Sequence, residues 1–250
     1  MIQNPEYLYY ICVILLTRLF FQFRDTPLKL RHTVYKTAIE TIALSIFAWN
    51  YWLIVLFLVI TAVNMFGYLF ERKSVRIKSL RLLTLFIYAI SLAFLLSPGT
   101  GIYFNDWLIF ILSDFEKHFI LLKLLTQMDW SYFLIIFTGF LLVLNEANIL
   151  IRYLMESLHL VPQLKSSRKE EAIDTREYNR GRVIGILERI LIYFFVFNNH
   201  LSAVGFILAA KGITRFKELE NREFAEYFLI GTLLSSIISG AIAMLFRGML

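Results

Sequence analysis

The sequence predicts an all-α protein, a polytopic membrane helical bundle with about 6–8 membrane segments plus amphipathic interfacial helices. Of its 250 residues, 58% are hydrophobic and only 18% are charged. The mean hydropathy of +0.66 is too high for a chain that hides its apolar side chains in one soluble core. The chain has only four prolines and eleven glycines, which favours helices joined by short connections. The bilayer is therefore the expected solvent.

Apolar stretches near the length of a membrane span recur along the chain. A crossing takes about 20 residues at a rise of 1.5 Å per residue. The expected segments are 8–23, 36–50, 52–70, 81–97, 130–151, 183–198 and 227–246, with 201–210 as a half-length return segment. Segment 106–127 mixes acidic and basic side chains with apolar ones. It is expected to be re-entrant or to lie on the membrane surface.

The first segments have further signals. Arg18 interrupts the stretch 8–23 and no small-residue cleavage site follows it, so this stretch is expected to be a retained helix. Trp49 and Tyr51 flank Asn50. Aromatic rings of this kind favour the headgroup level of a membrane. The turn around Asn50 is therefore expected at an interface, and the two segments beside it form a hairpin.

Basic residues gather in three connecting segments, 24–36, 72–81 and 165–182, whereas the loop 97–106 has none. The positive-inside rule places the first three on the cytoplasmic side and the fourth on the opposite side. The predicted location is a bacterial inner membrane, crossed several times. The net charge of +6 fits basic loops that face anionic lipid. The alternative is a surface for a cytoplasmic anionic ligand, a nucleotide or oligonucleotide.

The chain is expected to have two membrane parts. Residues 162–182 mix both signs of charge and form the predicted cytoplasmic linker. It separates an N-terminal transmembrane bundle, 1–161, from a C-terminal transmembrane unit, 183–250. No internal repeat is visible.

Charged side chains in the C-terminal unit give the main candidate site. On a helix, Arg182 and Arg189 share one stripe and Glu188 lies at its edge. Glu146 lies late in the preceding span and can add to a polar cavity. An ionised group near a bilayer centre costs roughly 2.5–3.5 kcal/mol on insertion scales. Such a cluster therefore lines a pore or a ligand pocket, or it locks two helices together as a structural ion pair.

A second charged set follows at helical spacing. Its members are Lys211, Arg215, Glu218, Arg222 and Glu226. On one continuous helix they share one face, which predicts a helix lying flat on the cytoplasmic interface, with pairs from Arg215 to Glu218 and from Arg222 to Glu226. The other interpretation is a charged gate or docking surface at the inner mouth of a pore.

The sequence offers little for a metal or an active site. Asp114 and His118 lie four residues apart and can meet at one metal ion, but a catalytic metal usually has three protein ligands. Cys12 is the only cysteine, so a thiolate cluster is excluded. No H-E-x-x-H, G-x-S-x-G or phosphate-binding loop motif occurs. No cofactor is predicted, and the composition does not favour an enzyme.

The C-terminal pattern G-R-V-I-G-I-L-E-R-I-L-I, followed by A-A-K-G-I-T-R-F-K-E and A-E-Y-F-L-I-G-T-L-L-S, covers residues 180–236. It resembles a bacterial multi-pass family known as a domain of unknown function. That family's N-terminal part implies a membrane-embedded metal site, including a D-Q-x-x-H element similar to Asp114 to His118. This chain retains Gln22 but has Arg18 where the family has an aspartate. The resemblance implies no activity, and it implies that the C-terminal segments form one unit.

The chain has charged residues within apolar segments but no recognisable set of catalytic residues, and this combination favours a channel. The leading hypothesis is an oligomeric ion channel or pore-type membrane effector, regulated from the cytoplasmic side by an anionic ligand or a soluble partner protein, with anti-phage defence as one setting for it. One alternative is a metal-dependent, membrane-embedded hydrolase of lipid or envelope substrates that uses Asp114 and His118. Another is a membrane scaffold for a soluble partner protein.

Overall fold

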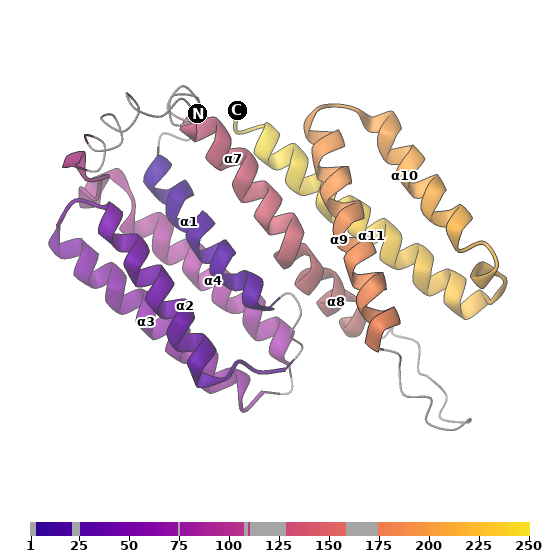
Figure 1. The fold of residues 1–250 in the computed structure, drawn as a ribbon, viewed down its shortest axis with the longest axis horizontal. Helices are drawn as coiled ribbons and strands as arrows, with labels where there is room; N and C mark the ends of the chain where they lie inside the picture. Colours follow the sequence, from indigo (N-terminus) through magenta and orange to yellow (C-terminus); the bar gives the residue numbers. More distant parts are fainter. Residues whose placement is uncertain (1–3, 22–25, 75, 108–109, 111–128, 159–174) are drawn as a thin grey trace. The chain divides into compact units, whose positions relative to one another are not determined.

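Helices make up nearly all of the chain that the structure describes (Figure 1). The computed structural model describes residues 4–21, 26–74, 76–107, 110, 129–158 and 175–250. Within these ranges the β-structure is one isolated bridge between Phe47 and Phe104. The predicted all-α class is confirmed. The chain folds into two compact units, Met1–Leu141 with Met249–Leu250, and Leu142–Gly248.

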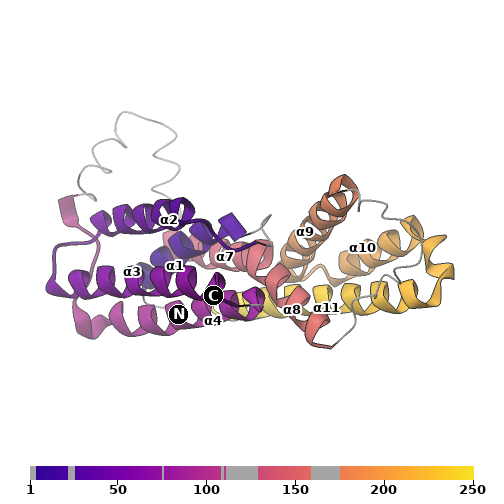
Figure 2. The ribbon, with the colours of Figure 1, turned by 90° about the horizontal axis from the view of Figure 1, so that it is seen from below.

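The first unit is a bundle of long helices that run side by side (Figure 1). Its helices are α1 (Pro5–Arg18), α2 (Leu30–Ala43), α3 (Tyr51–Glu71), α4 (Ile77–Leu95) and α7 (Trp130–Leu141), with 3₁₀ turns at Leu19–Phe21, Leu44–Ile46 and Pro98–Thr100. Helix α1 packs against α2, α4 and α7, and α3 packs between α2 and α4. Figure 2 shows α2 and α4 on opposite sides of α3. The buried apolar side chains of the unit lie on the faces where these helices meet.

One end of this unit is closed by the turn around Asn50. The Asn50 side chain caps α3 by accepting from the Trp52 amide, and its Nδ2 donates to the carbonyl of Thr100 at 3.0 Å. Gly101 follows with φ of 66°, a left-handed conformation that glycine adopts without strain. The 97–105 loop and the α2–α3 turn therefore lie at the same end. The two basic connections before α2 and before α4 meet at the other, where Arg81 donates to Thr26.

The second unit begins with a π-helical segment, Leu142–Glu146, that continues into α8 (Ala147–Ser157). It then contains α9 (Thr175–Phe197), α10 (Leu201–Thr214), a 3₁₀ turn at Glu218–Glu220 and α11 (Arg222–Arg247). Helix α9 packs against both α10 and α11, and α8 packs against α11 (Figure 1). The predicted linker, 162–182, lies outside the described residues as far as residue 174, and its remainder belongs to α9.

Four helices in the described part of the chain are long and apolar enough to cross a membrane. They are Tyr51–Glu71, Ile77–Leu95, Trp130–Ser157 and Phe224–Arg247. This is fewer than the six to eight membrane segments predicted from the sequence. Helices α1 and α2 have 14 residues each, which is short for a crossing of about 20. Most of predicted segment 106–127 lies outside the described residues.

The expectation of one continuous charged helix over 211–226 is wrong. Helix α10 ends at Thr214, whose hydroxyl donates to the Lys211 carbonyl at 2.9 Å. A new helix starts after Asn221, whose side chain accepts from the Phe224 amide. The Asn221 side chain thus caps a new helix, a signal that the spacing of charges alone did not reveal. The predicted pair of Arg222 and Glu226 is present, with 2.9 Å between Nε and Oε1.

Candidate functional site

The first unit buries an ion pair between two residues of α2. Lys36 Nζ lies 2.6 Å from Glu40 Oε1, and the side chains are 4% and 0% exposed. Residues four apart lie on one face of a helix, so the pair forms within α2. Thr17 of α1 donates to the same carboxylate oxygen at 2.5 Å. The hydroxyl of Tyr10 donates to the Glu40 carbonyl at 2.8 Å. Two helices therefore hold this glutamate.

Side chains from α3 and α4 complete the group. Asn64 donates from Nδ2 to Glu40 Oε2 at 2.6 Å and accepts from Lys36 Nζ at 2.5 Å. Tyr88 donates to Asn64 Oδ1 at 2.8 Å, and the Lys36 ammonium lies 5.0 Å from the centre of its ring. Both carboxylate oxygens of Glu40 are thus bonded. We call Thr17, Lys36, Glu40, Asn64 and Tyr88 the Lys36–Glu40 group.

A second charged group lies toward the end of the unit where the basic loops meet. Arg81 binds Glu71 with 3.0 Å between Nε and Oε1, and the Leu28 amide donates to Glu71 Oε2 at 3.2 Å. Arg18 donates to the Arg81 carbonyl at 2.7 Å and to the Thr84 hydroxyl at 3.1 Å. We call Arg18, Glu71, Arg81 and Thr84 the Arg81–Glu71 group. It ties the ends of α1, α3 and α4 to the segment before α2.

Phe21 packs between the two guanidinium groups. The carbon at the centre of the Arg18 guanidinium lies 5.1 Å from the ring centre, and that of Arg81 lies 4.4 Å from it. Both distances are within the range of a cation–π contact. The 3₁₀ turn after α1 places this ring, so the end of α1 helps to hold two buried cations in place.

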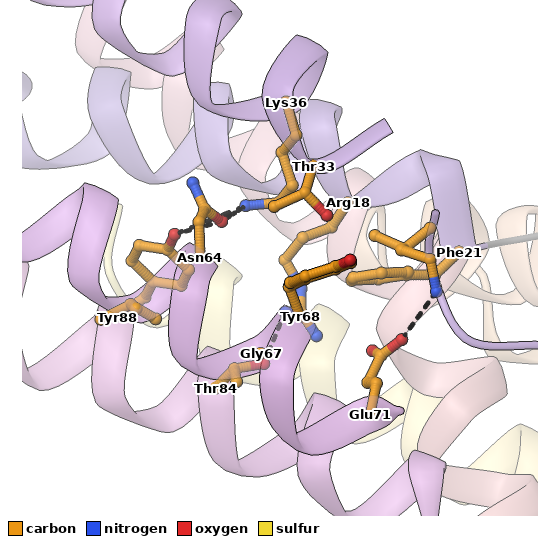
Figure 3. A pocket seen from close by; sticks show the side chains of 12 residues that line it. Arg18, Phe21, Thr33, Lys36, Asn64, Gly67, Tyr68, Glu71, Thr84 and Tyr88 are labelled. Atoms are coloured by element: carbon orange, nitrogen blue, oxygen red, sulfur yellow. Dashed lines mark hydrogen bonds between the residues drawn. The ribbon is translucent and has the colours of Figure 1, made fainter. Parts of the chain in front are cut away.

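A small cavity separates the two groups (Figure 3). Lys36, Asn64 and Tyr88 line it from the Lys36–Glu40 group. Arg18, Glu71 and Thr84 also line it, from the other group. Its volume is about 20 Å³, which is close to the space that one water molecule needs. The two groups therefore face one common space.

The polar side chains occupy only part of the length of the bundle. The buried residues of α3 before Asn64 are Leu53, Leu56, Ile60 and Val63, and those of α4 after Tyr88 are Leu92 and Leu95. The charged groups therefore lie toward the basic-loop end of α3 and α4, and the buried residues of these two helices beyond them are apolar. A path for an ion or a proton from the basic-loop end would reach as far as the Lys36–Glu40 group.

This arrangement can hold charge and transfer protons. Removing an ion pair from water costs several kcal/mol per ion, and only close geometry with full hydrogen bonding offsets it. The Lys36–Glu40 group has both. Its carboxylate and ammonium are hydrogen-bonded directly, and the Asn64 amide connects both of them to the phenol. In a helical bundle that crosses a membrane, such ionisable residues are rare and typically mark an ion or proton pathway.

The structure brings together part of the site predicted in the C-terminal unit. Glu188 pairs with Lys211 of α10, with 2.6 Å between Oε2 and Nζ. Arg189 is buried and its Nε donates to the Val143 carbonyl in the π-helical segment at 3.4 Å. Glu146 is buried in the same segment and accepts from its neighbour Asn145. Lys211 was expected on a solvated interfacial face, and its pairing inside the unit differs from that expectation.

The structure places the other predicted residues as follows. Arg182 lies in the first half of α9 and is partly exposed. Asp114 and His118 lie outside the described residues. Among the residues that the structure describes, no three His, Cys, Asp or Glu side chains are placed to hold a metal ion.

Sequence reasoning missed the larger polar site. Lys36, Arg81 and Arg18 were interpreted as loop charges or as an interruption of an apolar stretch. The available signal was the spacing of Lys36 and Glu40, since Glu40 falls inside an apolar segment with an opposite charge one helical turn before it. Asn64 in the middle of the predicted span 52–70 was a second signal.

Comparisons of the chain with family models, with curated proteins and with solved structures find no match. The described residues define a class, an all-α bundle with four helices that are able to cross a membrane. The resemblance of residues 180–236 to a family of unknown function stays a prediction.

Proposed function

We propose that this chain is an integral membrane protein that transfers protons through its N-terminal bundle. The observation that carries the proposal is the buried Lys36–Glu40 group, in which a carboxylate, an ammonium and a phenol are hydrogen-bonded within a bundle that contains apolar helices of spanning length. In this proposal Glu40 is the carboxylate that carries the proton, and Lys36 is its counter-ion. The Arg81–Glu71 group lies between this site and the basic-loop end.

The size of the cavity favours proton transfer over passage of a hydrated ion. A space of about 20 Å³ admits a water molecule but no hydrated cation. Protons need only a chain of hydrogen bonds, and each of the two groups supplies a part of one. Because the buried residues of α3 before Asn64 and of α4 after Tyr88 are apolar, release between these helices on the far side requires α3 or α4 to move. The site is thus loaded from the basic-loop side, which the positive-inside rule makes cytoplasmic.

The channel predicted from the C-terminal unit is a second candidate. The buried Arg189 and Glu146 beside a π-helical segment favour it, because such segments are frequent at functional sites. An oligomer, regulation by an anionic ligand and a role in anti-phage defence belong to this candidate as proposals. The metal-dependent hydrolase and the scaffold for a soluble partner stay predictions that no contact among the described residues favours.

The test is proton flux in proteoliposomes. Purified protein is reconstituted with a pH-sensitive dye inside, and a pH step and a potassium–valinomycin potential are applied. We expect dye responses above those of empty liposomes for the unchanged protein. Glu40→Gln is expected to abolish them, because an amide does not exchange a proton near neutral pH.

The matched control is Glu226→Gln. Glu226 also pairs with a cation four residues away, but that pair is exposed, with side chains 91% and 61% accessible. This variant should conduct as the unchanged protein does. No flux in the unchanged protein, or full flux in a folded Glu40→Gln variant, would contradict the proposal. Flux lost in Arg189→Gln and retained in Glu40→Gln would favour the C-terminal channel.

A further inference from the structure

The cavity between the two charged groups contains a hydroxyl that has no partner. Thr33 of α2 lines the cavity, is 7% exposed, and its Oγ1 makes no hydrogen bond among the described residues. Figure 3 shows Thr33 beside Lys36 and Arg18 at this space. A buried hydroxyl without a partner is costly, and polar groups in this position are usually satisfied by an ordered water. The cavity volume of about 20 Å³ fits one such molecule.

We propose that this cavity binds one water molecule, which accepts or donates a hydrogen bond at Thr33 Oγ1 and joins the Lys36–Glu40 group to the Arg81–Glu71 group. A buried water needs two to four polar partners. Thr33, Lys36, Asn64, Glu71 and Arg18 all line the cavity and have polar side chains. The water therefore lies where it completes a hydrogen-bonded route from the basic-loop end to Glu40.

The first test asks whether the substitution Thr33→Val lowers or raises the melting temperature. Valine has the shape of threonine without its hydroxyl. If the water is bound, the variant loses a hydrogen bond, and we expect the melting temperature to fall by about 2–4 °C. If the cavity is dry, the variant removes an unpaired buried hydroxyl and the melting temperature rises, which overturns the proposal. Thr232→Val in α11 is the matched control, because that hydroxyl is also unpartnered and does not line this cavity.

The second test fills the cavity. Gly67 lines it, and a Cβ placed on Gly67 would meet the Thr84 methyl at 3.7 Å, an ordinary contact. Gly67→Ala therefore adds a methyl group without a clash. Gly231→Ala is the control, because its Cβ would also make only an ordinary contact, with Met155 at 3.8 Å. This variant measures the gain in helix stability that replacing glycine by alanine brings by itself. A melting temperature for Gly67→Ala below that of Gly231→Ala supports the water, and an equal or higher one contradicts it.

The role of the water rests on the proposed proton transfer, but its presence does not. In a conducting protein, Thr33→Val is expected to lower the flux roughly tenfold, the scale of one hydrogen bond to a charged group. Unchanged flux in that variant would overturn the bridging role. If the unchanged protein passes no protons, the proposed function fails, and the two melting comparisons still decide whether the water is there. An anion in place of the water would make both melting temperatures depend on chloride concentration, and that result would also overturn the proposal.

Discussion

Replacing Glu40 by glutamine tests how much the buried ion pair contributes to stability. In the structure, Oε1 accepts from Lys36 and Thr17, and Oε2 accepts from Asn64. A glutamine amide puts an N–H against one of these donors in either orientation. Rotating Asn64 does not relieve the conflict, because its Oδ1 already accepts from Lys36 and Tyr88. The ammonium also loses its counter-ion.

The expected loss of stability in Glu40→Gln follows from the burial of both Lys36 and Glu40. Removing one member of a buried pair typically costs about 3–5 kcal/mol, because the other charge stays behind unpaired. For a chain of this length, that corresponds to a melting temperature about 6–20 °C lower. Thermal unfolding in detergent micelles, followed by tryptophan fluorescence, measures it. The double variant Lys36→Met with Glu40→Leu should recover most of the loss, since it removes both charges at once.

The control for this prediction is Glu226→Gln. Glu226 and Arg222 are four residues apart, as Lys36 and Glu40 are, but their pair lies on the surface. The Glu226 hydrogen bond and charge raise the pKa of Arg222, yet water screens the pair. We expect no resolvable change in melting temperature. If Glu40→Gln lowers the melting temperature no more than Glu226→Gln does, or if the double variant is as unstable as the single one, the reasoning from burial and pairing is refuted.

Three further substitutions test other contacts. Arg81→Lys keeps the charge but loses the forked contact with Glu71, so the melting temperature should fall by several degrees and trypsin should cut the folded protein faster. Tyr88→Phe removes the hydroxyl that binds Asn64 and should cost about 0.5–1.5 kcal/mol in the same unfolding assay. Gly101→Ala forces alanine into a left-handed conformation and should cost about 1–2 kcal/mol, with an unchanged stability contradicting the backbone argument.

Much of the fold was predictable because hydropathy follows local sequence. The predicted spans 52–70 and 81–97 correspond closely to α3 and α4. The turn at Asn50 was visible in its aromatic neighbours. The break between α10 and α11 was not predicted, because it depends on side-chain caps such as that of Asn221, which charge periodicity does not report.

The polar site was less predictable, because part of it is made by residues that are far apart in the sequence. Lys36 and Glu40 are local neighbours, and their pairing could be read from the sequence. Asn64 and Tyr88, however, come 24 and 48 residues after Glu40 and meet it only when α2, α3 and α4 pack. The positive-inside rule counts basic residues without regard to burial, so it assigned Lys36 and Arg81 to solvated loops. Tertiary packing instead places both inside the bundle.

The one-sided position of the charges limits how the bundle can work. A charged side chain is most costly near the centre of a bilayer. Among the described residues of the first unit, the buried charged side chains are Arg18, Lys36, Glu40, Glu71 and Arg81, and they lie toward the basic-loop end. The apolar residues of α3 and α4 beyond them, Ile60 and Leu92 among them, are fully packed. In the proposed proton transfer, a proton on Glu40 would stop there until those two helices separate, so movement of α3 against α4 would be the step that controls transfer.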